Sequence, residues 1–203
     1  SDISVSENLE SIFAQAHAFT GSLDALVNNA AIQIAKPLVQ TSTEEWDAVM
    51  ASNLRSIFLT AKYGYSLLKA AHGAVINVSS VHAVATSVDI AAYAASKGAL
   101  NAGTRAIAVE LAPHNIQVNA IAQNFVDNPT YFPAELQANP AFQERLKRDV
   151  PLGRLVGARE ELLVARVGAV LLRQLAHQCR LLSWALARKI RRDHGHAVAG
   201  AAA

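Results

Sequence analysis

A tyrosine and a lysine spaced four residues apart are the side chains in this sequence best suited to chemistry. They are Tyr93 and Lys97, in the run Tyr-Ala-Ala-Ser-Lys, and in a helix they would share one face about one turn apart. A free tyrosine has a pKa of about 10, which is too high for easy proton exchange at neutral pH. A neighbouring ammonium group favours the phenolate, so we expect Lys97 to lower the pKa of Tyr93. Such a pair can act as general acid or base on a carbonyl or an alcohol.

Ser80 lies thirteen residues before Tyr93, at the end of an apolar run. A hydroxyl at that place could donate a hydrogen bond to the reacting oxygen. For His82, two residues further on, we favour an ordinary structural role over a substrate contact. Because Tyr-x-x-x-Lys occurs by chance in many amphipathic helices, the surrounding elements must decide whether these residues meet.

Three long helices are predicted from the spacing of apolar residues and from capping signals. The run Ser-Thr-Glu-Glu at 42–45 has the spacing of a capping box, and Ser6 is the expected cap of the first helix. The last helix carries Tyr93 and Lys97. The expected helices span about residues 7–19, 42–70 and 91–111.

Apolar runs predict three strands between these helices. They lie at about residues 23–30, 74–80 and 116–121. Strands that alternate with helices of this length indicate a doubly wound α/β fold, a parallel sheet with helices on both faces. Ligands of such sheets bind beyond the carboxyl ends of the strands, and Asn28, Ser80 and Gln123 fall at those ends. The sequence therefore predicts a site at this edge of the sheet.

Composition limits the class of protein. The chain has 203 residues, 52% of them apolar, which suffices for one domain with a real core. A net charge of +2 gives no argument for a nucleic-acid partner. The single Cys179 excludes an internal disulfide framework and fits a reducing compartment. With no leader, no bilayer-spanning run and no metal-ligand spacing among the histidines, we expect a cytoplasmic protein without membrane partner or metal.

Five motifs stand in the order and spacing of the short-chain dehydrogenase/reductase family, which residues 1–161 resemble. They are Asn28-Asn-Ala-Ala31, Asn53 in Ala-Ser-Asn-Leu, Ser80 ahead of Tyr93, Tyr93-Ala-Ala-Ser-Lys97, and Asn119-Ala120. The resemblance implies a Rossmann-type α/β/α fold and hydride transfer between NAD or NADP and a carbonyl or secondary alcohol. It also implies a homo-oligomer, because in the family the helices that would contain Asn53 and Tyr93 pack against copies of themselves.

The same resemblance implies four catalytic residues. Tyr93 would be the acid/base, and Lys97 would lower its pKa while binding the nicotinamide ribose. Ser80 would polarise the substrate oxygen. Asn53 would hold a water molecule in a proton relay with Lys97.

The cofactor-binding residues implied by the resemblance are Asp2, Asn28, Ala30, Tyr93 and Lys97. Asn28 would stabilise the central strand beside the cofactor, and Asp2 would lie near the adenine ring. The family's Gly-x-x-x-Gly-x-Gly turn, which binds the phosphates, is not found in the sequence. We therefore expect the first βαβ unit of the fold to be lacking, and with it the residues that choose between NAD and NADP.

Residues 122–133 depart from the family pattern. They read Ala-Gln-Asn-Phe and onward, where family oxidoreductases have a Pro-Gly turn, and they resemble the halohydrin dehalogenases, which hold a halide in place of the nicotinamide. Those enzymes use an arginine where this chain keeps Lys97. Because an arginine stays charged and cannot relay a proton, Lys97 favours hydride chemistry. A dehalogenase-like lyase and a catalytically inactive remnant that binds no cofactor remain the alternatives.

The segment 162–203 is a second departure, which we separate from the partial Rossmann-type domain of residues 1–161. Arginines recur there and just before it at every seventh position. They are Arg159, Arg166, Arg173 and Arg180. One interpretation is a basic amphipathic helix for a partner or a membrane surface. The other, which we favour, is a shifted reading frame after about Glu161.

Overall fold

Three parallel strands form the sheet in the part of the chain that the structure describes. The computed structural model describes residues 2–157, so the expected tail segment 162–203 lies outside the described residues. The strands are β1 (Ala25–Asn28), β2 (Ala74–Ser80) and β3 (Gln117–Gln123), in the order β1-β2-β3. Both pairings are parallel, which confirms the parallel sheet expected from the sequence.

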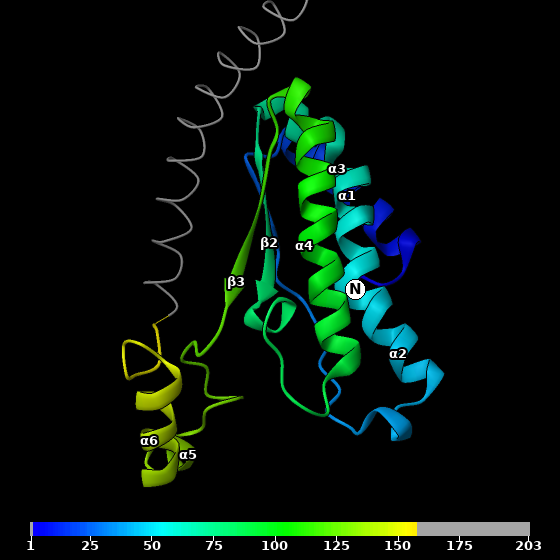
Figure 1. The fold of residues 1–203 in the computed structure, drawn as a ribbon. Coiled ribbons are helices and arrows are strands. Elements are labelled where there is room, and N and C mark those ends of the chain that lie inside the picture. The colour runs from blue at the N-terminus through cyan, green and yellow to red at the C-terminus, as the bar shows by residue number, and fades with distance from the viewer. Residues whose placement is uncertain (1, 158–203) are drawn as a thin grey trace, which may run out of the picture. The chain divides into compact units, whose positions relative to one another are not determined.

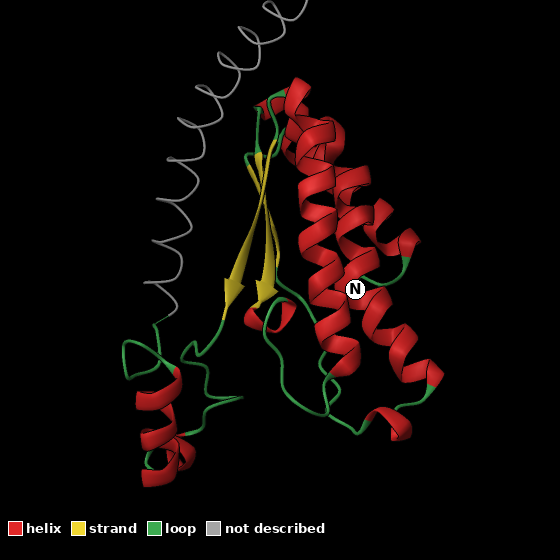
Figure 2. Cartoon of the chain, viewed as in Figure 1, coloured by secondary structure: helices red, strands yellow, loops and turns green. Residues whose placement is uncertain are grey.

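The long helices lie together on one face of this sheet (Figures 1 and 2). They are α1 (Ser6–Thr20), α3 (Ser56–Ala71) and α4 (Ala91–Leu111). The connections from β1 to β2 and from β2 to β3 step in the same direction, and right-handed crossovers then place their helices on the same face. The expected layer of helices on the opposite face is not supplied by residues 2–157.

The opposite face of the sheet is correspondingly open. Leu26 packs on the helical side, so its neighbour Val27 points the other way. The side chain of Val27 is 54% exposed, and its register partners across the sheet are Ile76 and then Asn119. Apolar side chains on this face are therefore exposed, and another polypeptide segment can pack against them.

The helix expected at residues 42–70 is divided in two. It consists of α2 (Thr43–Met50), a π-helical turn at Ala51–Arg55, and α3. The capping box at the start of α2 is confirmed, because the Glu45 amide donates to the Ser42 hydroxyl and the Ser42 amide donates to the Glu45 carboxylate.

The expected cap of α1 was wrong. Helix α1 begins at Ser6, and its N-cap is Val5, which has no side-chain oxygen to offer. The Ser6 hydroxyl instead forms a 2.8 Å hydrogen bond with the Tyr63 hydroxyl of α3. A tertiary contact therefore replaces the local capping interaction.

The core lies between the helices and the sheet. One cluster joins α1 to α3 through Leu9, Phe13, Leu59 and Leu67. A second joins α3, β2 and β3 through Leu68, Val75, Ile116 and Val118. Close approach of α1 to α3 requires Gly64, since a Cβ there would lie 2.8 Å from Cε1 of Phe13.

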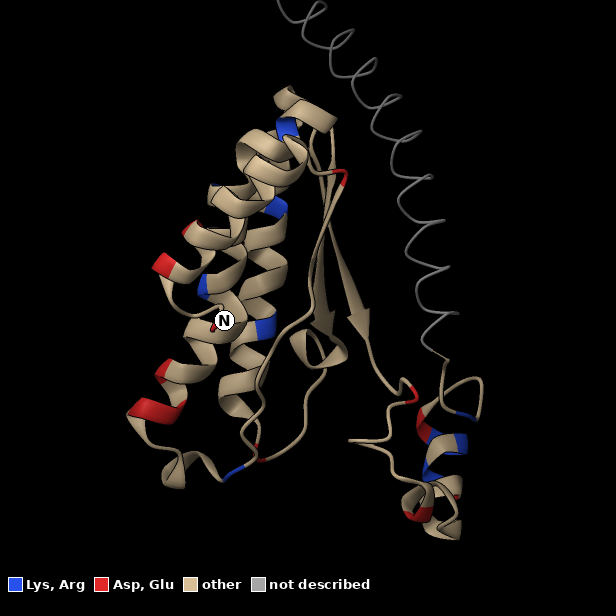
Figure 3. Ribbon diagram, turned by 180° about the vertical axis from the view of Figure 1, so that it is seen from behind, with Lys and Arg blue, Asp and Glu red and all other residues tan. Residues whose placement is uncertain are grey.

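The segment after β3 forms a small cluster of its own around α5 (Ala134–Gln137) and α6 (Pro140–Asp149). Its apolar residues are Phe125, Phe132, Phe142, Leu146 and Val150. Acidic and basic residues stand side by side on α6 (Figure 3). None of the helices in residues 2–157 is long and apolar enough to cross a membrane.

Candidate active site

Tyr93 and Lys97 lie in the first two turns of α4, as their spacing predicts. Lys97 is only 3% exposed, and its Nζ donates a 2.7 Å hydrogen bond to the Val78 carbonyl of β2. The same Nζ lies 5.5 Å from the centroid of the half-buried Tyr93 ring. Packing of α4 on β2 therefore brings the ammonium group beside the phenol.

The pKa of Tyr93 shifts in the direction opposite to our expectation. Burial raises the pKa of Tyr93, and a hydrogen bond with the Ser80 hydroxyl offsets this only in part. Burial also lowers the pKa of Lys97 to about 8. The expected lowering of the Tyr93 pKa by Lys97 is absent in this structure, because the Lys97 ammonium is directed at the Val78 carbonyl and desolvation of the phenol dominates.

Ser80 is the last residue of β2 and is buried. It caps the short 3-10 turn η3 (Val81–Ala83), and its Oγ accepts a 3.2 Å hydrogen bond from the His82 amide. The His82 ring meets the Tyr93 ring edge-on, with the centroids 6.1 Å apart. The end of β2 thus places the Ser80 hydroxyl beside the Tyr93 phenol, and sequence reasoning missed the contact of the His82 ring.

Asn53 lies in the π-helical turn and is 2% exposed. Its Oδ1 accepts from the Ile32 amide at 2.8 Å, while its Nδ2 donates to the Ile32 carbonyl at 2.9 Å and to Oγ of Ser96 at 3.1 Å. The Ser96 hydroxyl donates to the Tyr93 carbonyl at 2.7 Å. Asn53 is therefore joined to α4 through Ser96, whose role the sequence signalled only by its place inside the Tyr-Ala-Ala-Ser-Lys run.

Asn28 begins a chain of hydrogen bonds that links β1, β2 and α4. Its Nδ2 donates to Oδ1 of Asn77 at 2.7 Å, and Nδ2 of Asn77 donates to the Thr104 hydroxyl of α4 at 2.9 Å. The Thr104 hydroxyl in turn donates to the Leu100 carbonyl at 2.8 Å. This chain of hydrogen bonds, partly buried at Asn28 and buried at Asn77 and Thr104, ties β1 to β2 and β2 to α4.

Asp2 and Ala30 lie apart from this network. The Asp2 carboxylate is exposed and accepts from the amide of Ser4 at 2.8 Å and from its hydroxyl at 2.7 Å. Ala30 is exposed in the loop that follows β1. No hydrogen bond within residues 2–157 connects either of them to Tyr93.

The residues around Tyr93 fit the nicotinamide ribose end of a dinucleotide. Lys97 has no carboxylate partner among the described residues, and one carbonyl leaves two of its three ammonium hydrogens for ribose hydroxyls. A glycine-rich cradle for the phosphates is not found in the sequence. Tyr93 and Lys97 are thus the residues that would hold the ribose of a bound cofactor.

Comparison with known proteins identifies the family. A family model described as enoyl-(acyl carrier protein) reductase matches residues 1–180. The chain belongs to the short-chain dehydrogenase/reductase family. The match continues past residue 161, where the resemblance seen in the sequence ends.

Three members of this family illustrate the similarity. Cyclopentanol dehydrogenase from Comamonas is 45% identical over 108 residues, which are 53% of this chain and 43% of that protein. 3beta-Hydroxysteroid dehydrogenase 1 from Eggerthella lenta is 36% identical over 166 residues, 81% of this chain and 62% of that protein. A crystal structure of gluconate 5-dehydrogenase from Burkholderia cenocepacia, in complex with NADP and tartrate, has a TM-score of 0.73 and 30% identity, over 81% of this chain and 64% of that one.

These matches establish the Rossmann-like α/β fold of the short-chain dehydrogenase/reductase family for this chain. The chain spans about half to two thirds of the length of these relatives. They lend no support to the halohydrin dehalogenase resemblance of residues 122–133, because each is named as a dehydrogenase.

Proposed function

We propose that this protein is an NAD(P)-dependent oxidoreductase that transfers a hydride between the nicotinamide and a carbonyl or secondary alcohol. The observation that carries the proposal is the half-buried Tyr93 phenol with the Ser80 hydroxyl and the Lys97 ammonium group beside it. Membership of the short-chain dehydrogenase/reductase family supports it. When bound, NAD(P) supplies or accepts the hydride.

Tyr93 would handle the proton. Because burial raises its pKa, the phenol is protonated at neutral pH and can donate its proton to the oxygen of a carbonyl substrate. The oxygen of Ser80 already accepts from the His82 amide, and its hydroxyl proton, which faces the Tyr93 hydroxyl, would turn to the same substrate oxygen when a substrate is bound. In alcohol oxidation both roles run in reverse.

Lys97 would resupply the proton and hold the ribose. A pKa of about 8 lets its ammonium group give up and regain a proton near neutral pH. Asn53 would contribute through Ser96, which fixes the backbone of α4 at Tyr93. The water-mediated relay of Asn53 and the cofactor contacts of Asp2, Asn28 and Ala30 are part of the proposal.

Two of the three relatives are named for cyclic alcohols, cyclopentanol and a hydroxysteroid, and these names support a cyclic secondary alcohol or ketone as substrate, while the third is named for gluconate. The single Cys179 supports a cytoplasmic location. We further propose a homo-oligomer formed through α3 and α4. Both helices carry exposed apolar side chains, Phe58 and Val109.

The test is a titration of the full chain with NADH and with NADPH, followed by nicotinamide fluorescence and by thermal melting. Saturable binding that raises the melting temperature is expected, and the tighter cofactor is then used with cyclopentanone. Absence of binding at millimolar cofactor, with a cooperative melt intact, would contradict the proposal and leave the inactive-remnant interpretation.

A further inference from the structure

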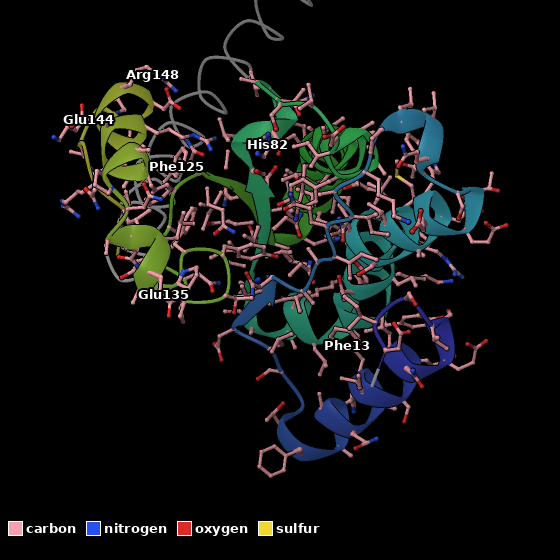
Figure 4. All side chains as sticks on the ribbon, turned by 90° about the horizontal axis from the view of Figure 1, so that it is seen from below. Phe13, His82, Phe125, Glu135, Glu144 and Arg148 are labelled. Carbon is pink, nitrogen blue, oxygen red and sulfur yellow. The ribbon has the colours of Figure 1, made fainter. Side chains whose placement is uncertain are left out.

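We propose that His82 is a positioning residue of this site, whose main chain holds the Ser80 hydroxyl and whose imidazole forms a side wall of the Tyr93 ring. The inference rests on the proposed function, because it assigns His82 to the pair of residues that would act on the substrate oxygen. Figure 4 labels His82 beside the end of β2.

The main-chain contact fixes the direction of the Ser80 hydroxyl. The His82 amide donates to Oγ of Ser80 at 3.2 Å, at the start of η3. Because the oxygen accepts on that side, its own hydrogen is turned toward other acceptors, and the Tyr93 hydroxyl is the one that it meets. Any residue at position 82 with a backbone amide could supply this contact, so the specific contribution of histidine lies in its ring.

The His82 ring shields the phenol from water. Its plane is inclined by 71° to that of Tyr93, with the centroids 6.1 Å apart, which is the favourable edge-to-face arrangement of two aromatic rings. Burial also lowers the pKa of His82, so this wall carries no charge at neutral pH. The Lys97 ammonium lies 5.5 Å from the centroid of the Tyr93 ring, and the charge interaction with Tyr131 adds to the rise in the pKa of Tyr93.

The imidazole forms this wall at a cost to the stability of the fold. Nδ1 of His82 is buried and has no hydrogen-bond partner among residues 2–157. An unpaired buried nitrogen destabilises a fold, and a phenylalanine would give a similar flat ring without that penalty. The nitrogen is thus unused by the fold at a place next to Ser80 and Tyr93.

The experiment is a spectroscopic titration of tyrosine ionisation near neutral to alkaline pH, in the range where the fold is intact. The difference between the full chain and its Tyr93→Phe variant isolates the phenol of Tyr93. In His82→Ala we expect this titration to move to lower pH by roughly one unit, because water reaches the phenol. In His82→Phe, which keeps a flat ring, we expect the titration to stay in place and the melting temperature to rise.

His114 provides a matched control. Its ring meets Tyr65 edge-on at 5.3 Å, beyond the C-terminal end of α4, so it forms the same kind of pair at the opposite end of that helix from Tyr93. His114→Ala should lower the melting temperature without moving the Tyr93 titration. An unmoved titration in His82→Ala, or a shift of the same size in His114→Ala or in His82→Phe, would overturn the proposal.

This readout needs neither cofactor nor turnover. A protein that fails to bind NADH or NADPH would contradict the proposed function and still report on His82. If the enzyme is active, the alkaline limb of kcat/KM should move with the titration of Tyr93 in His82→Ala and stay in place in His82→Phe.

Discussion

At the scale of single residues, burial governs the two groups most suited to proton transfer. The Tyr93 phenol keeps its proton more tightly than free tyrosine, and the Lys97 ammonium releases its proton more readily than free lysine. Both shifts favour the uncharged form, as desolvation requires. Transfer of a proton from the phenol to the amine would create two charges in this buried place, so the two shifts favour neutral phenol beside neutral amine over the ion pair.

The first prediction concerns the pH dependence of catalysis. Alcohol oxidation requires the deprotonated form of Tyr93, so its kcat/KM should rise with pH, and the raised pKa places that rise in the alkaline range. Tyr93→Phe should remove the rise and reduce kcat by about 10²–10⁴-fold. Tyr65 lies in α3 outside the site, so Tyr65→Phe should keep both the rise of kcat/KM with pH and the value of kcat. An alcohol oxidation rate that is independent of pH between 6 and about 10 would contradict the role of Tyr93.

The second prediction concerns the stability of Lys97→Met. A buried lysine whose pKa falls from 10.5 to about 8 destabilises the folded state at neutral pH by about 3 kcal/mol. Methionine removes that penalty but loses the hydrogen bond to the Val78 carbonyl, worth about 1 kcal/mol. We therefore expect the free energy of unfolding at pH 7 to increase by about 2 kcal/mol while turnover is lost. Chemical denaturation of both proteins is the measurement, and a less stable variant would contradict the prediction.

The same residue predicts how the stability of the unmodified protein changes with pH. Between pH 8 and pH 10.5 the unfolded chain holds the Lys97 proton and the folded chain has released it. Stability should therefore rise with pH across this window. Tyr93 acts in the opposite direction only above pH 10, because its raised pKa makes the folded state hold the proton longer. The rise should be absent in Lys97→Met.

At the scale of elements, close contacts between helices and strands depend on glycines. A Cβ at Gly73 would overlap the Leu23 carbonyl oxygen, so the chain leaving α3 can pass beside the start of β1 only without a side chain. The preceding His72 adopts the left-handed conformation that ends α3. Sequence reasoning would place both features at a helix end, but only the approach of a distant segment explains why glycine is needed.

The third prediction concerns the contact of α1 with α3. Gly64→Ala places a methyl group 2.8 Å from Cε1 of Phe13, and overpacking of this kind costs about 1–3 kcal/mol. Gly103→Ala, where the added Cβ would lie 3.5 Å from Ile57, should instead be neutral or stabilising by up to about 1 kcal/mol. Thermal denaturation of both variants is the measurement. Combining Gly64→Ala with Phe13→Leu should recover part of the stability lost in Gly64→Ala, because the smaller side chain makes room for the methyl group. If the stability changes of the two single variants simply add, the contact is contradicted.

At the scale of the whole molecule, apolar side chains remain exposed on the outer helices. Phe58 of α3 is 55% exposed and Val109 of α4 is 77% exposed. These helices carry the site, since α3 follows the π-helical turn of Asn53 and α4 holds Tyr93. A homo-oligomer formed through α3 and α4 would bury Phe58 and Val109. It would also stabilise the two helices that position the site.

The fourth prediction tests that assembly. The double variant Phe58→Glu and Val109→Glu should shift the mass measured by light scattering after size exclusion from the oligomer toward the monomer, because buried charges oppose association. Phe19→Glu, which alters the 90% exposed side chain of α1, should leave the mass unchanged. A monomeric unmodified chain, or a double variant that keeps the oligomer, would contradict the proposed interface.

The sequence by itself determined the type and order of the elements that surround the site. Apolar periodicity and the Ser42 capping box located the helices, and the short apolar runs located the strands. The motif spacing placed Tyr93, Lys97 and Ser80 at the ends of neighbouring elements, where the structure has them. These features depend on local patterns within a few residues, which a linear sequence displays directly.

Tertiary structure alone decided how those residues behave. The π-helical turn aims Asn53 at Ser96, and the turn after β2 sets His82 against Tyr93. The pKa of Tyr93 rises because neighbouring segments remove water from the phenol. Such effects sum contributions from residues far apart in the chain, and desolvation has no signature in local spacing. The sequence therefore identified the acid/base pair but predicted the wrong sign for the pKa shift of Tyr93.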